Sequence, residues 1–387
     1  MKGIPLSTLV PNTYFDEPVY LDKSYILLTP DSPVAPELVR RLQKWKYSQV
    51  LTDGKPKDNP SYLSGADKNS ISPQTIDEDI RDAEQVTAAR KFIGEFQAFA
   101  AALFAKFAAE GTLNLADVTE WVKKTIQVVR DCKDCVLRYL EVTADADRYL
   151  VTHAVNTTVL ALAIGDYLKA PPHRLIELGN ACMLHEIGMT KIPESLQRSA
   201  RRLSADERKA MIAHTAMGYR ILKGISAPEN VALAALEHHE RIDGSGYPRN
   251  LGGEKITEYA RIIAVACSYD AMVSRRPFRA ESIGGHSAIK EFLQKSRKQY
   301  DDRVLKALVY TLSVYPVGTP VLLTNGGRAV VVKTDPASPR YPVVRVLVDP
   351  EGKTLTSPPL VQTSEAKGIG IAKVLDAEEA RDLLAKA

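Results

Sequence analysis

The sequence predicts a mainly α protein, with a helical bundle between a small α/β unit at the N-terminus and a short β appendage at the C-terminus. Helical hydrophobic periodicity dominates the middle of the chain, and short strand-like runs separated by turn residues occur near both ends. A polar, proline-containing stretch separates the first unit from the rest. At 387 residues, the chain is long enough for two or three domains.

The composition is that of an ordinary soluble protein, with 45% hydrophobic and 25% charged residues. A net charge of +4 and the lack of a long Lys/Arg run give no reason to expect nucleic-acid binding. The sequence has neither a signal-peptide pattern nor an uncharged apolar run that could span a bilayer. Four cysteines are few for this length, as is typical of a reducing compartment. We therefore expect a cytoplasmic protein that does not enter a membrane.

Residues 1–52 are expected to form the small α/β unit. Residues 18–21 and 24–28 are strand-like and suit a hairpin, and residues 36–45 have their apolar residues on one helical face. No residue here suggests chemistry. We expect a regulatory or assembly role for this unit, with a protein as its partner.

Residues 53–75 have the composition of a linker, and residues 76–142 are expected to form connecting helices. Apolar residues recur in these helices at three- and four-residue steps: Phe92, Phe96, Phe99, Leu103 and Phe107. Such a stripe is typical of a core or a helix–helix contact, including a homodimer contact. Cys132 and Cys135 have CxxC spacing, but no second pair accompanies them, and we expect ordinary helical positions rather than a metal or redox site.

Residues 143–314 have almost only helical patterning, and residues 315–387 are expected to form the β appendage and a terminal helix. Asn325-Gly326-Gly327 is a hairpin signal within the appendage.

Five of the seven histidines lie on expected helical segments of the bundle: His153, His185, His214, His238 and His239. One buried histidine is more often structural than a ligand, because its ring nitrogens can be satisfied by other polar groups. Five on different segments, one of them followed by Glu186, favour a metal site in the bundle core. His173 and His286 lie in expected loops and are expected to be bystanders.

The run from His238 to Pro248 reads His-His-Glu-Arg-Ile-Asp-Gly-Ser-Gly-Tyr-Pro. At every position it fits the His-His-Glu-x-x-Asp-Gly-x-Gly-Tyr-Pro signature of the HD-GYP family, a branch of the HD superfamily of metal-dependent phosphohydrolases. The chain resembles this family over about residues 143–315. The resemblance implies an HD-type helical bundle and a phosphodiesterase of bacterial signalling, which hydrolyses cyclic di-GMP to pGpG and further to GMP. It also implies bound iron or manganese.

The resemblance implies two metal ions, because Tyr149 stands where family members with a third ion carry a glutamate. The first ion would bind His153, His185, Glu186 and Cys267. The second ion would bind Glu186, His214, His238 and His239.

Three positions depart from the family pattern. Glu186 replaces the aspartate that bridges the two metals, and Met189 replaces a lysine near the substrate phosphate. Losing such a cation removes on the order of 2–4 kcal/mol of transition-state stabilisation, unless Lys191 takes its place as a catalytic residue. Cys267 replaces an aspartate ligand. A thiolate can bind iron or zinc but suits manganese poorly, and the alternative for Cys267 is a small buried residue.

Substrate contacts are expected at four residues. Arg276 corresponds to the first arginine of the family's Arg-Pro-Tyr-Arg segment, and a guanidinium makes a two-pronged contact with phosphate or guanine. A solvated charge is the alternative for Arg276. Asp243, Gly246 and Tyr247, in the signature loop, are expected to line the pocket.

Two functions therefore stay open: a cyclic di-GMP phosphodiesterase with altered or weakened activity, and a catalytically inactive protein that binds cyclic di-GMP or a protein partner. The joint change at Glu186, Met189 and Cys267 favours the second function. Retention of all five histidines favours the first, because unused ligands would be a liability when buried.

Overall fold

The computed structural model describes residues 1–10, 13–22, 25–28, 34, 36–44, 47–57, 80–138, 140, 148–199, 201–274, 283–294, 298–335, 340–356, 358–364 and 368–385. The chain divides into two compact units. The helical unit comprises Ala83–Gly284 and Ser296–Thr311, and the mixed unit comprises Met1–Asp82, Gly285–Lys295 and Leu312–Ala387. The predicted five-segment division stays a prediction, and most of the expected linker at 53–75 lies outside the described residues.

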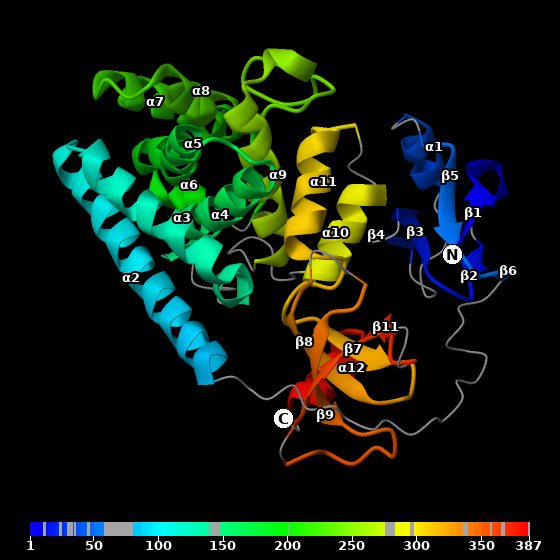
Figure 1. Cartoon of the computed structure of the whole chain (residues 1–387). Helices are drawn as coiled ribbons and strands as arrows, with labels where there is room; N and C mark the ends of the chain where they lie inside the picture. The colour runs from blue at the N-terminus through cyan, green and yellow to red at the C-terminus, as the bar shows by residue number, and fades with distance from the viewer. Residues whose placement is uncertain are drawn as a thin grey trace. The chain divides into compact units, whose positions relative to one another are not determined.

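The helical unit is built from the following elements: α2 (Ile80–Glu110), α3 (Leu115–Arg138), α4 (Tyr149–Tyr167), α5 (Pro172–Leu184), η4 (Ile187–Lys191), α6 (Glu194–Gln197), α7 (Ala205–Gly224), α8 (Glu229–Glu237), η5 (Gly253–Lys255), α9 (Glu258–Val273) and α11 (Asp302–Leu312). The central helix is α4, which is buried without interruption from Thr152 to Gly165. It packs against α3, α5 and α9, while α7 packs against η4 and α8 (Figure 1). A helix that is apolar on all sides belongs in the middle of a bundle.

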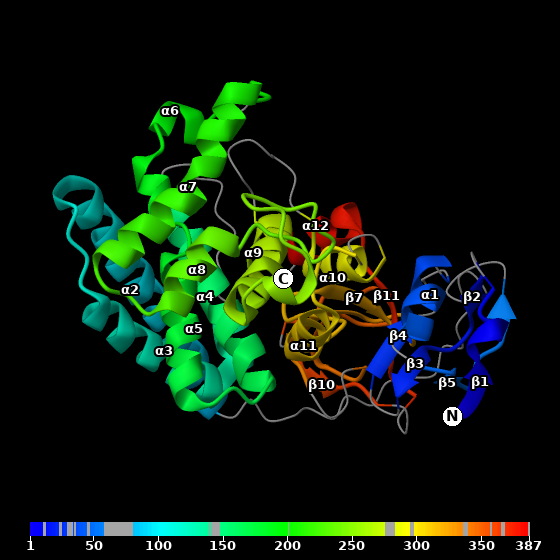
Figure 2. The same ribbon diagram turned by 90° about the horizontal axis from the view of Figure 1, so that it is seen from above.

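The connecting helices α2 and α3 run alongside one another (Figures 1 and 2). The predicted aromatic stripe on α2 packs on Trp121 of α3, whose ring stacks on Phe96 and Phe99 with centroids 5.6 and 5.3 Å apart. The stripe therefore makes an intramolecular contact. By length and a mean hydropathy of 1.3, Gln85–Glu110 is also a candidate membrane span, although 44% of the apolar window in it is buried.

The prediction for the CxxC pair is wrong. Cys132 and Cys135 are joined by a disulfide, and Cys132 interrupts α3 with φ −152° and ψ 79°. Helical periodicity around the pair hid this break, and the CxxC spacing was the correct signal.

The mixed unit contains a four-stranded sheet and a five-stranded sheet. The first has the order β1-β5-β3-β4, with β1 (Lys2–Pro5), β3 (Val19–Asp22), β4 (Tyr25–Leu28) and β5 (Gln49–Thr52), and β3 and β4 form the expected antiparallel pair. The second has the order β10-β9-β8-β7-β11, with β7 (Pro320–Leu323), β8 (Arg328–Lys333), β9 (Val343–Val348), β10 (Leu360–Gln362) and β11 (Ile371–Val374). The remaining described elements are η1 (Leu6–Thr8), the pair β2 (Tyr14–Phe15) and β6 (Pro56–Lys57), and the helices α1 (Pro36–Lys44), α10 (Gly285–Gln294) and α12 (Ala377–Ala385).

The predicted fold class is confirmed: the chain is mainly α, with a small α/β part near the N-terminus and a β part near the C-terminus. The hairpin signal at Asn325-Gly326-Gly327 is also confirmed. Gly326 has φ +93°, and the amide of Leu323 donates to the carbonyl of Gly327 at 2.8 Å.

Gly188 sets the approach of η4 to α7. A Cβ atom added at Gly188 would lie 1.9 Å from the carbonyl oxygen of His214 and 2.7 Å from the amide nitrogen of Gly218. Both are backbone atoms of a helix and cannot rotate away. Glycine at this position therefore lets the segment that carries His185 and Glu186 lie directly against the helix that carries His214.

We expect Gly188→Ala to destabilise the helical unit by about 1–3 kcal/mol or more, because the added methyl group overpacks a backbone contact. Gly94→Ala in exposed α2 is the matched control. No atom lies within 4 Å of its added Cβ, and alanine in a helix is about 0.5–1 kcal/mol more favourable than glycine. Urea unfolding followed by circular dichroism measures both changes. Equal stability of the two variants would contradict the close approach.

Candidate metal centre

Seven predicted ligands converge in two groups. The Glu186 cluster consists of Glu186, His214, His238 and His239, and the Cys267 cluster consists of His153, His185 and Cys267. Within each cluster, the ligand atoms all lie within 4.8 Å of one another. The structure therefore brings together every side chain that the sequence singled out as a metal ligand.

Five elements deliver these side chains. His153 lies in the first turns of α4, His214 lies within α7, and Cys267 lies within α9. The other ligands follow helix ends, with His185 and Glu186 directly after α5 and the pair His238-His239 directly after α8. The negative end of a helix dipole favours a cation, so both junctions are suited to metal ligands.

Three histidines have the same local anchor. The Nδ1 atoms of His185, His214 and His238 lie 2.5, 2.6 and 3.0 Å from the backbone carbonyl oxygen three residues earlier. A carbonyl oxygen only accepts, so Nδ1 carries the hydrogen in each ring and donates it. In the neutral imidazole, Nε2 then keeps a lone pair that can bind a metal.

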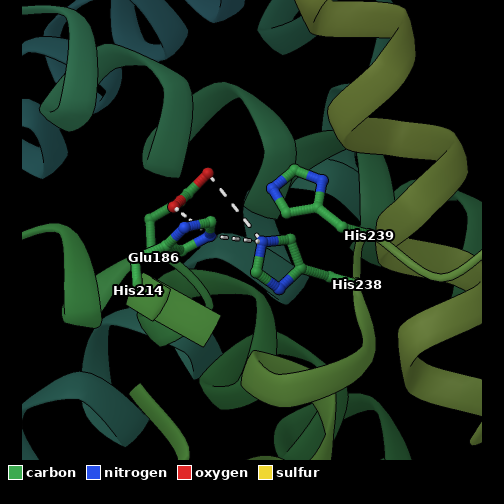
Figure 3. Close-up of side chains that lie close together, drawn as sticks. All are labelled: Glu186, His214, His238 and His239. Carbon is green, nitrogen blue, oxygen red and sulfur yellow. Dashed lines mark hydrogen bonds and ion pairs between the residues drawn. The ribbon is translucent and has the colours of Figure 1, made fainter. Parts of the chain in front are cut away.

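These lone pairs face one another in the Glu186 cluster (Figure 3). The Nε2 atoms of His214 and His238 are 3.4 Å apart, and Oε2 of Glu186 lies 3.3 Å from Nε2 of His214. Lone pairs on neutral rings and a carboxylate repel at such distances. A shared cation would turn this repulsion into coordination, so the donor set fits a divalent metal.

The protonation states suit metal binding. Burial by itself would raise the pKa of Glu186, but the surrounding histidines, His214 foremost, lower it to about 2. Burial and the neighbouring rings hold the pKa values of His238 and His239 well below their ordinary value. The carboxylate is therefore ionised and these imidazoles are neutral at neutral pH, as metal ligands must be.

The Cys267 cluster depends on Asp270, which the sequence analysis did not place in the site. Nδ1 of His153 donates to Oδ2 of Asp270 at 2.6 Å, and the amide of Asn156 and the hydroxyl of Ser274 donate to Oδ1 at 2.8 and 3.0 Å. All four side chains are buried. Asp270 therefore fixes the His153 ring, and Nε2 of that ring faces the Cys267 sulfur at 3.3 Å.

The surroundings of Cys267 lower the pKa of its thiol. Burial would raise its pKa, but the charge and hydrogen bond of His153 lower it to about 6. The pKa of His153 is raised to about 10, because Cys267 and Asp270 outweigh the opposing effect of burial. The thiolate is the form that binds metals, and a cation would take the place of the proton that His153 shares with it.

Other signature residues build the loop rather than the cluster. Glu240 is buried and accepts hydrogen bonds from the amides of Arg249 and Leu251 at 2.7 and 2.9 Å. A Cβ atom at Gly246 would lie 2.4 Å from Cα of Glu240 and 2.5 Å from the carbonyl oxygen of His239. The loop therefore folds back tightly on its own start, next to the cluster.

The predicted substrate-binding residues in this loop have two different surroundings. The ring of Tyr247 lies against the ring of His239 with centroids 4.7 Å apart, beside the Glu186 cluster. Asp243 is exposed, and its Oδ1 accepts hydrogen bonds from the amide and hydroxyl of Ser245 at 3.0 and 2.6 Å. Asp243 thus shapes the turn, and its predicted contact with substrate stays a prediction.

Two predicted residues are not brought to the clusters by the described part of the chain. Lys191 is exposed and its Nζ lies 5.1 Å from the ring centroid of Phe107 on α2. Among the described residues, Lys191 has no hydrogen bond or ion pair with either cluster. Arg276 lies outside the described residues.

Asp270→Asn is expected to weaken metal binding by about 10- to 100-fold, because the amide cannot accept from both His153 and Asn156 in the same orientation. Ser274→Ala removes only one of the three hydrogen bonds to the same carboxylate and serves as the matched control, with a loss within about threefold. Competition with a chelator measures both affinities, and circular dichroism verifies folding. Equal affinities in the two variants would contradict the positioning role of Asp270.

Residues 139–304 match an HD domain, and residues 320–383 match a KOW domain associated with HD domain. A cyclic di-GMP phosphodiesterase of Borreliella burgdorferi is 27% identical over 245 residues, 63% of this chain and 64% of that protein. A cyclic di-GMP phosphodiesterase of Pseudomonas aeruginosa is 33% identical over 211 residues, 54% of this chain and 50% of that protein. A 3'3'-cGAMP-specific phosphodiesterase of Vibrio cholerae is 32% identical over 148 residues, 38% of this chain and 32% of that protein.

The chain thus spans between about a third and two thirds of the length of these relatives. Its HD-domain match contains the whole signature from His238 to Pro248 and all seven residues of the two clusters. Residues 139–304 are therefore similar to an HD domain, and they contain the complete signature run and the buried histidines of both clusters.

Proposed function

We propose that this chain hydrolyses cyclic di-GMP with the help of two divalent metal ions, iron or manganese. The observation that carries the proposal is the convergence of buried imidazole lone pairs on Glu186, which a divalent cation would satisfy. The names of the similar proteins support the substrate class, a cyclic dinucleotide.

Glu186 is the residue proposed to serve both ions. One oxygen lies 3.3 Å from Nε2 of His214, in its own cluster, and the other lies 4.0 Å from Nε2 of His185, in the Cys267 cluster. The carboxylate therefore reaches both groups despite its extra methylene. Bound divalent ions would neutralise phosphate charge and lower the pKa of a water molecule that can attack phosphorus.

The reaction consumes one water for each bond cleaved. The water oxygen joins phosphorus, the bond from phosphorus to the ribose 3′ oxygen breaks, and that oxygen takes a proton. Cleavage of one bond gives linear pGpG, and cleavage of the second gives GMP. Tyr247 and Gly246 are proposed to line the pocket beside His239, with Asp243 and Arg276 as further substrate contacts.

The rate is proposed to be lower than that of a family member with the complete pattern. Met189 replaces the family lysine, and Lys191 would have to leave Phe107 to replace that charge at the phosphate. The alternative function, an inactive protein that binds cyclic di-GMP, is favoured by the same observation.

A cytoplasmic location, a homodimer through α2 and α3, and a protein partner for residues 1–52 complete the proposal.

Metal-loaded, anaerobically purified protein is expected to convert cyclic di-GMP to pGpG, measured by chromatography of the nucleotides. His238→Ala should lower the rate by at least about 100-fold, because it removes a ligand whose ring has its Nδ1 already anchored. His173 lies at an exposed position of α5 and not in the expected loop, and His173→Ala is the matched control that should retain the rate.

Parallel assays with 3'3'-cGAMP test which cyclic dinucleotide is the preferred substrate. A stoichiometric metal content without turnover of cyclic di-GMP would overturn the proposed hydrolysis. Faster turnover of 3'3'-cGAMP would keep the reaction class and overturn the substrate.

A further inference from the structure

The two clusters differ in the chemistry of their donors. The Glu186 cluster offers three imidazoles and a carboxylate, whereas the Cys267 cluster offers two imidazoles and a thiol. We infer that the Cys267 cluster is a thiolate metal site that selects zinc, cobalt or iron(II) over manganese and magnesium. This inference rests on the proposed function only in that both require bound metal.

The donor atoms of the Cys267 cluster are buried and held in place by other side chains. Cys267 is 6% exposed and His153 is 2% exposed, so water does not solvate these donors freely. Sγ of Cys267 lies 3.3 Å from Nε2 of His153, whose other nitrogen is fixed by Asp270. A ligating histidine held by a carboxylate through its second nitrogen is the usual support of a metal site.

His185 supplies an independent observation. Its Nδ1 is held by a backbone carbonyl, and its Nε2 is fully buried without a hydrogen-bond partner among the described residues. This orphaned lone pair belongs to the same group of ligand atoms as Cys267 and His153. Leaving a buried acceptor unsatisfied is costly, and a cation at the cluster would remove that cost.

The line from Asp270 through His153 to Cys267 also resembles the carboxylate, imidazole and thiol of a cysteine nucleophile. Two features favour the metal. A nucleophile must meet its substrate, whereas the Cys267 sulfur is buried. A nucleophile also needs one imidazole, and here a second imidazole, from His185, converges on the same sulfur.

The selectivity follows from the sulfur. Thiolate ligands favour zinc, iron and copper(I), whereas manganese and magnesium prefer carboxylate, carbonyl and water oxygens. The Glu186 cluster lacks sulfur and does not impose the same choice.

Cobalt titration of the metal-free full chain tests the inference without substrate. The wild type should develop a thiolate-to-cobalt charge-transfer band that saturates at about one equivalent. Cys267→Ser should lose this band, and Cys267→Asp should lose it while retaining cobalt. Cys182→Ser is the matched control, because Cys182 is the other free, buried cysteine and belongs to neither cluster. It should retain the band.

Elemental analysis after equilibration with equal zinc and manganese tests the selectivity. The wild type should hold about one zinc at this cluster, and Cys267→Asp should shift the zinc-to-manganese ratio toward manganese by about tenfold.

Cobalt binding without the band, or a band that persists in Cys267→Asp, would each overturn the inference. Because these measurements use no nucleotide, a failure of turnover leaves them unaffected, and a failure of the band leaves a measured turnover standing.

Discussion

The geometry of the site depends on a hydrogen bond in which one nitrogen of a buried imidazole donates to a backbone carbonyl. The carbonyl oxygen three residues earlier accepts the Nδ1 hydrogen of His185, His214 and His238, and this bond fixes both the ring and its tautomer. Each Nε2 is then left as an acceptor in a buried region. A cation between several such acceptors and the carboxylate would satisfy them together, so the backbone geometry orients these side chains as metal ligands require.

The packing of the helices brings these histidines together. Buried α4 brings His153 to α9, where Asp270 holds one side of the ring and Cys267 faces the other. In the Glu186 cluster, Gly188 lets η4 lie directly against α7, and Glu186 then lies next to His214. The two clusters are thus assembled by different pairs of elements and share Glu186, whose two oxygens approach one histidine of each cluster.

The seven candidate ligands could be predicted from the histidine series and from the resemblance to the family, and the structure brings them together in two clusters. The role of Asp270 was not predictable in the same way, since it requires that α4 and α9 cross at His153. Its position three residues after Cys267, like that of Asn156 three residues after His153, was the available signal. The contact of Lys191 with Phe107 was not predictable for a similar reason, because Phe107 lies on a helix far away in the sequence.

The departures from the family pattern preserve the charge of the centre while changing its chemistry. Glu186 keeps the negative charge of the aspartate that it replaces, and its pKa of about 2, lowered chiefly by His214 against the effect of burial, ensures ionisation. The pKa of Cys267 falls to about 6 beside His153 despite its burial, so the thiolate carries the charge of the second missing aspartate. Two anionic side chains therefore remain at neutral pH. A pair of divalent ions would meet the same negative charge as with two aspartates, but one of the donor atoms would be a softer sulfur. On the proposed function, these two substitutions would alter which metal is favoured more than whether metal binds, whereas Met189 would change the charge available to the substrate phosphate.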